Sequence, residues 1–175
     1  MVGPRQQHFR HFALYNRWAN QQLYRSAERC SLVELTKDRG AFFSSILGTL
    51  NHLLVTDRMW RKRLEGNSPS GVKLDELLFA DLPSLAEARR DEDRALIATV
   101  YVYSEEELGA TMAYATSSGA SQTQPLHEVL AHLFNHQTHH RGQAHDLLGQ
   151  ALGKDRTPVL DLLYYQRTAA VNDAP

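Results

Sequence analysis

The sequence contains very little cysteine, since Cys30 is the only one in 175 residues. A single thiol excludes an intrachain disulfide and a metal site built from several cysteines. Long apolar runs are also missing, because no stretch approaches the roughly 20 apolar residues that a membrane span requires. The first ten residues lack the apolar segment of a signal peptide. These features lead us to expect a cytoplasmic protein with no membrane partner.

An excess of either charge is absent as well. The chain has 19 Lys and Arg against 20 Asp and Glu, a formal net charge of -1. Such a chain lacks the basic surface that binds phosphate backbones, which argues against a nucleic-acid partner. Hydrophobic residues make up 42% and charged residues 22%, a composition typical of globular rather than disordered chains. At this length we expect one hydrophobic core and predict a single domain over residues 1–175.

Histidine, in contrast, is abundant, and four of the nine histidines lie in one stretch, HLFNHQTHHRGQ. Apolar residues recur at three- and four-residue spacing from Pro125 to Ala151, which predicts an amphipathic helix containing this stretch. His136 and His140 lie on or near its apolar face. Three further histidines of the helix point away from that face: His132, His139 and His145.

The spacing of His136 and His140 places both rings within reach of one cation, because their Cβ atoms are roughly 6 Å apart on one helical face. Two ligands are too few, and His132 starts roughly 12 Å from His140, so a third ligand must come from another helix. The alternative is that both are core histidines bonded to backbone or water. A shared cation is favoured because it satisfies two buried polar rings at once.

Apolar spacing predicts three further helices and a hairpin. The expected elements are helices over Gln6–Arg29, Phe42–Leu64 and Pro83–Tyr103, short helical segments near 74–79 and 155–165, and a β-hairpin formed by 110–116 and 122–124. Ser84 and Glu87 have the spacing of a capping box at the start of the third helix. The prediction is an all-α fold, a four-helix bundle with a small β-hairpin between helices three and four.

The predicted helix Phe42–Leu64 has apolar residues on both sides, which indicates burial on both sides. His52 therefore has no solvent-facing position and is a candidate third ligand, the alternative being a buried histidine bonded to a carbonyl. His8 and His11 are rival ligands, although their place near the chain start favours solvation.

Two further features of the same helix require an explanation. Its second apolar face leads us to predict a homodimer, since an isologous contact is the commonest way to bury such a stripe. Asp57 and Arg63 are most simply an ion pair, either with each other or with a partner helix.

Four motifs, taken together, resemble the DinB/YfiT-like family. In chain order they are Tyr15-Asn16-Arg17-Trp18-Ala19-Asn20, Asn51-His52 followed by Asp57 and Trp60, the turn near Gly119, and Asn135-His136 with His139-His140-Arg141-Gly142-Gln143. The resemblance implies a four-helix bundle that holds a divalent metal ion, often nickel or zinc, through His52, His136 and His140. Iron also accepts nitrogen ligands and is a further candidate.

The resemblance also implies an activity, because the family includes thiol-dependent transferases and isomerases beside members with no assigned reaction. We therefore expect a small-molecule substrate, and a low-molecular-weight-thiol S-transferase before a small metal-dependent hydrolase. The alternative is a non-catalytic bundle in which the ion is structural or sensed. Four polar residues near the site's helices can orient a substrate: Tyr15, Asn135, Arg141 and Gln143. No general base is predicted.

Overall fold

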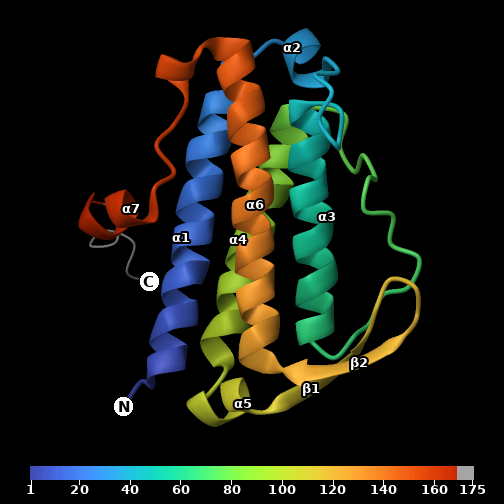
Figure 1. Cartoon of the computed structure of the whole chain (residues 1–175), viewed down its shortest axis with the longest axis vertical. Helices are drawn as coiled ribbons and strands as arrows, with labels where there is room; N and C mark the ends of the chain where they lie inside the picture. Colours follow the sequence, from blue (N-terminus) through green and yellow to red (C-terminus); the bar gives the residue numbers. More distant parts are fainter. Residues whose placement is uncertain (169–175) are drawn as a thin grey trace.

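The chain is mainly helical in the computed structural model, which describes residues 1–168. Four long helices lie side by side (Figure 1): α1 (Pro4–Ala27), α3 (Ile46–Leu64), α4 (Leu82–Val102) and α6 (Leu126–Leu152). The shorter helical elements are α2 (Leu32–Thr36), α5 (Glu105–Gly109), the 3-10 turn η1 (Lys154–Arg156) and α7 (Leu162–Thr168). We expect residues 173–175 to fray at the chain end, and they lie outside the described residues.

The long helices enclose two apolar clusters separated by a polar layer. α1 and α3 each pack against both α4 and α6. Leu50, Leu54 and Leu85 belong to one cluster, and Leu130 and Phe134 to the other. The polar layer consists of buried side chains from all four long helices: Asn16, Asn20, Asp57, Arg89, Asp93, Gln137 and Arg141. The buried polar side chains therefore lie midway along the four long helices, between the two apolar clusters.

Local caps decide where α3 and α4 begin, and both starts differ from the predicted residues. α3 starts at Ile46 rather than Phe42, since the Ser45 hydroxyl accepts a hydrogen bond from the Gly48 amide at 3.1 Å. α4 starts at Leu82, since Asp81 accepts from the Ser84 amide at 2.8 Å. The predicted capping box of Ser84 with Glu87 is therefore wrong.

The predicted hairpin is confirmed. β1 (Thr111–Ala115) and β2 (Ser121–Pro125) pair antiparallel, with Met112 opposite Gln124. Gly119 has φ +87° in the turn, a conformation that favours glycine. The hairpin lies at the end of the molecule where α3 finishes and α6 begins (Figure 1).

A long connection over residues 65–81 runs beside α3 (Figure 1). No helix forms at 74–79. The Glu76 amide donates to the Lys73 backbone oxygen at 3.2 Å in a single turn, and the Asn51 side-chain amide bonds both backbone groups of Phe79, at 3.0 and 2.9 Å. Val55 and Met59, on the second apolar face of α3, are 4% and 7% exposed and line a surface cavity with residues of this connection. That face is thus covered within one chain, and the homodimer stays a prediction.

Among residues 1–168, no helix combines the length and the apolar character needed to cross a membrane.

Candidate metal centre

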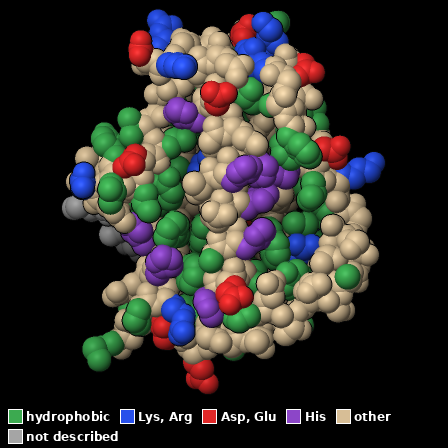
Figure 2. Space-filling view, viewed as in Figure 1, with side chains coloured by type: hydrophobic (Ala, Val, Ile, Leu, Met, Phe, Trp, Pro, Cys, Tyr) green, Lys and Arg blue, Asp and Glu red, His purple; other side chains and the backbone are tan. Residues whose placement is uncertain are grey.

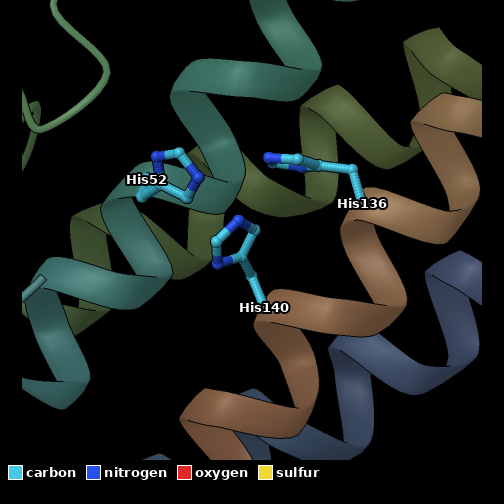
Figure 3. Close-up of side chains that lie close together, drawn as sticks. All are labelled: His52, His136 and His140. Carbon is cyan, nitrogen blue, oxygen red and sulfur yellow. The ribbon is translucent and has the colours of Figure 1, made fainter. Parts of the chain in front are cut away.

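Three histidines from two helices meet between α3 and α6 (Figure 3). His52 extends from α3, while His136 and His140 extend from successive turns of α6. One ring nitrogen of each lies within 4.8 Å of the others. The ring centres are 4.4 Å apart for His52 and His140, 4.4 Å for His136 and His140, and 5.3 Å for His52 and His136. The structure thus brings together the three residues that the resemblance implied.

Carbonyl oxygens orient two of the three rings. His52 Nδ1 lies 2.7 Å from the Leu74 backbone oxygen, and His140 Nδ1 lies 2.7 Å from Gln143 Oε1. A carbonyl oxygen can only accept, so each Nδ1 carries the proton and each Nε2 presents a lone pair. His52 Nε2 is buried and has no hydrogen-bond partner. A bound cation would satisfy this atom, so the residues present fit a metal ion.

Burial keeps the three imidazoles neutral. It lowers the pKa of His136 to about 3, with further lowering by the neighbouring imidazoles of His140 and His52. Burial likewise lowers the pKa of His52 to about 4, although the Leu74 carbonyl partly opposes this shift. The pKa of His140 is lowered as well, chiefly by burial. Neutral imidazole is the form that ligates a metal, so the site is ready for a cation at neutral pH.

The site is open to the surface on one side. His52 is 3% exposed, whereas His136 and His140 are only partly buried. Figure 2 shows histidine side chains gathered on the face of the molecule that α6 presents. A surface cavity of about 480 Å³ adjoins the site, lined by Phe42, His139 and Gln143 among others. A small molecule can therefore approach beside His140.

Phe43 is a neighbour of the site that sequence reasoning missed. Its ring stacks on His52 at 3.8 Å between centres and meets His140 edge-on at 5.5 Å. The predicted helix Phe42–Leu64 includes Phe43, whereas the Ser45 cap leaves this residue in the preceding loop. The Leu74 oxygen was missed for another reason, since a backbone carbonyl carries no residue-type signal.

Of the four polar residues suggested to orient a substrate, only Gln143 lies at the histidines. Arg141 is buried, bonds Asn16 Oδ1 and places its guanidinium 5.4 Å from the Tyr15 ring centre. The Tyr15 hydroxyl donates to the Leu160 oxygen at 2.6 Å, and Asn135 lines a separate groove beside α1. Contacts between elements account for Arg141 and Tyr15, whereas Asn135 is exposed and lies away from the histidines.

The rival ligands do not join the cluster. The His8 ring packs 4.8 Å from that of Phe12, and His11 Nε2 lies 3.2 Å from the Gln166 amide nitrogen. Both lie on α1, and the three-histidine cluster contains neither.

Comparison with known proteins places the chain in a family. Residues 5–172 match the family described as "DinB family". The chain belongs to the DinB family. Protein DinB of Bacillus subtilis (strain 168) is 26% identical over 145 residues, covering 78% of this chain and 82% of that protein. A DinB-like protein of Bacillus cereus ATCC 10987 has a crystal structure similar at a TM-score of 0.59 and 16% identity, covering 76% of this chain and 85% of that one. At such identity the second likeness concerns the fold alone.

Behind the histidines, this DinB-family chain buries an ionic network. Arg89 Nη1 lies 2.8 Å from Asp57 Oδ2, and Arg89 Nη2 lies 3.0 Å from Asp93 Oδ1, with all three side chains at most 2% exposed. Gln137 donates to the Leu53 backbone oxygen at 3.2 Å and to Asp57 Oδ1. Asp57 thus pairs with a partner helix and not with the arginine on its own helix. The residue after His136 is thereby tied to the residue after His52.

Proposed function

We propose that the protein is a divalent-metal-dependent enzyme in which His52, His136 and His140 hold nickel or zinc, with iron as a further candidate. The observation that carries this proposal is the convergence of three neutral imidazoles at a partly exposed position. Structural sites are usually closed by four protein ligands, whereas catalytic sites keep a position open. Within residues 1–168 no fourth His, Cys, Asp or Glu joins the cluster.

When bound, the ion would supply a Lewis acid that lowers the pKa of a water molecule or a thiol at its open position. The chain itself supplies orientation and shielding. The Leu74 oxygen and Gln143 hold the His52 and His140 tautomers, and Phe43 covers one face of the His52 ring. The adjoining cavity gives a small substrate room.

Within the enzyme proposal, a low-molecular-weight-thiol S-transferase comes first because of the family resemblance, and a small hydrolase second. The packing of α1, α3, α4 and α6 supports the four-helix bundle that the resemblance implies. In the non-catalytic alternative we would expect a closed, dry site. The partial exposure of His136 and His140 argues for turnover instead.

Metal binding is tested by elemental analysis of protein purified without an affinity tag. We expect about one divalent ion per chain, and close to none in the His136→Ala, His140→Ala double variant. The matched control is His145→Ala on the same helix, where Nε2 lies 2.9 Å from the Pro158 backbone oxygen and not at the site. Unchanged stoichiometry in the double variant would remove these residues from the site.

Catalysis is tested by a turnover screen of the metal-loaded protein with low-molecular-weight thiols and electrophilic acceptors. Turnover is expected in wild type and His145→Ala and should fall to background in His52→Ala. Equal activity in wild type and His52→Ala would reject metal-centred catalysis. A fully loaded protein that turns over no thiol pair would reject the transferase and favour the non-catalytic alternative.

A further inference from the structure

Arg63, in the last turn of α3, is a buried cation without an acidic partner. It is 4% exposed, and its Nε has no hydrogen-bond partner. Within residues 1–168, no carboxylate oxygen lies within 4.0 Å of its guanidinium. Arg58 and Arg61 on the same helix both pair with Glu92, at 3.8 and 2.6 Å. Since burying an unpaired charge is unfavourable, folding alone does not explain Arg63.

Two aromatic rings hold the guanidinium in place. Its central carbon lies 4.5 Å from the ring centre of Trp60 and 5.4 Å from that of Tyr114 on β1. The two rings meet edge to face at 5.3 Å, so hairpin and helix share the contact. Ring faces offset part of the lost hydration but offer no acceptor in the plane of the guanidinium. The two rings thus hold the Arg63 guanidinium in place, and its N–H groups have no acceptor among the described residues.

A row of rings connects Arg63 with the three histidines. Trp60 meets the His132 ring at 5.2 Å, and His132 lies 5.9 Å from His136. Histidine side chains continue over this face toward the hairpin end of the molecule (Figure 2). From His52 to Arg63, α3 rises roughly 16 Å, and the arginine leans back over Trp60, one turn closer to His52. The guanidinium is therefore roughly 10 Å from the centre of the site.

We propose that Arg63, held by Trp60 and Tyr114, binds a carboxylate group of the substrate whose reacting atom lies at the three histidines. The inference deepens the proposed function and rests on it for the identity of that reacting atom. One unpaired guanidinium balances the single charge of a carboxylate and can bind both of its oxygens through two parallel hydrogen bonds. A phosphate monoester, with nearly two charges, would remain partly unbalanced. The substrate class is an elongated carboxylated small molecule.

The test separates the subsite from metal chemistry by using metal-free protein. A Trp18→Phe background leaves Trp60 as the only tryptophan, so its fluorescence reports binding beside Arg63. Hexanoate and hexanamide are each titrated into the protein, and hexanamide has the same shape as hexanoate without the charge. We expect hexanoate to bind about tenfold more tightly or better, as one charge-assisted hydrogen-bond pair allows. Arg63→Met should reduce the preference to within about twofold.

The matched control is Lys62→Met, which removes one positive charge at the neighbouring, exposed position and should keep the preference. Arg63→Lys keeps the positive charge but lacks the planar guanidinium, so it should retain only part of the preference for hexanoate. This variant preserves the test if Arg63→Met does not fold. Equal binding of hexanoate and hexanamide, or a preference that survives in Arg63→Met, would overturn the proposal. Tighter binding of hexyl phosphate than of hexanoate would overturn the carboxylate assignment.

A second arm compares 6-mercaptohexanoate with 6-mercaptohexanamide as substrates of the metal-loaded protein. A carboxylate preference that depends on Arg63 in both arms supports the subsite and the proposed function together. Preference for hexanoate without turnover of either thiol would reject the proposed function and keep the subsite. Turnover of both thiols at equal KM would reject the subsite and keep the enzyme.

Discussion

The His140 ring is hydrogen-bonded by a single side chain, that of Gln143. Gln143, one turn further along α6, accepts from Nδ1 at 2.7 Å and so directs Nε2 toward the other histidines. His52 receives the same help from the Leu74 backbone oxygen, which no substitution can remove. Gln143 is therefore the position at which ring orientation can be tested without touching a ligand.

We predict that Gln143→Leu lowers zinc affinity about tenfold, because partners of metal-binding histidines typically contribute 10- to 100-fold. Competition with a chromophoric chelator measures the affinity. Gln150→Leu is the matched control, since Gln150 lies on the same helix and bonds Asp146 at 2.9 Å, away from the histidines. An affinity equal to wild type in Gln143→Leu would show that the ring is oriented by packing alone.

Acid should destabilise the metal-free protein through the same histidines. Burial lowers the pKa of His136 to about 3 and of His52 to about 4, whereas an unfolded histidine titrates near 6.5. Between about pH 6.5 and about pH 4 the unfolded chain binds protons that the folded chain does not. The stability is therefore fully present above about pH 6.5 and is lost as the pH falls through this window.

Urea unfolding at a series of pH values from about 7.5 to about 4.5 measures this loss. The His136→Ala, His140→Ala double variant should show a shallower decline. Burial raises the pKa of Asp57 to about 6, which acts in the opposite direction but equally in both proteins. Identical slopes in the two proteins would contradict the prediction.

How much of the site the sequence could predict differs from residue to residue. Helical spacing was enough to place His136 and His140 on one face. His52 needed the family resemblance, because a helix apolar on both sides does not say which neighbour a side chain faces. The spacing predicts an ion pair for Arg63, because it cannot reveal that Asp57 is already paired with Arg89 on another helix. Its isolation is a property of the packed structure only.

Among the elements, α3 and α4 are joined by the most deeply buried charges. We predict that Arg89→Ala lowers the free energy of unfolding by about 3–5 kcal/mol, because it leaves Asp57 and Asp93 buried without a cation. Urea unfolding measures the change. Arg94→Ala, on the same helix, should change stability by less than about 1 kcal/mol, since Arg94 and its partner Asp91 are 68% and 59% exposed. Equal losses of unfolding free energy in Arg89→Ala and Arg94→Ala would show that burial does not strengthen the ionic network.

Periodicity predicted the long helices and the hairpin well, but not the segments between them. Residues 74–79 have a helix-like composition, yet the side chain of Asn51, more than 20 residues away, holds Phe79 in another conformation. α5 was not predicted either. It begins at a capping box in which Ser104 and Glu107 bond each other reciprocally. Such segments depend on one or two specific bonds, which a count of apolar spacing does not detect.

At the scale of the whole molecule, the homodimer remains a prediction, but its motivating apolar face is buried inside one chain. The exposed apolar residues left at the α2 end are Val33 and Phe42, at 74% and 85% exposure, with Leu32 beside them. We expect a dimer in sedimentation at micromolar concentration, and a monomer for Val33→Asp, Phe42→Asp. Val102→Asp, equally exposed but at the far end of α4, is the control. A monomeric wild type would contradict the prediction.

The buried charges of Asp57, Arg89 and Asp93 also limit how far α4 can slide along α3. The apolar cluster that contains Leu50 and Leu85 consists mainly of leucine and alanine, which can interdigitate at more than one offset. Sliding α4 by one turn, roughly 5.4 Å, would separate Arg89 from Asp57 and leave the Asp57 carboxylate buried without a cation. Gln137 likewise fixes the position of α6 along α3, because it donates hydrogen bonds to the Leu53 backbone oxygen and to Asp57. The register that places His52 opposite His136 and His140 is thus set by the packing of the chain's own buried polar side chains.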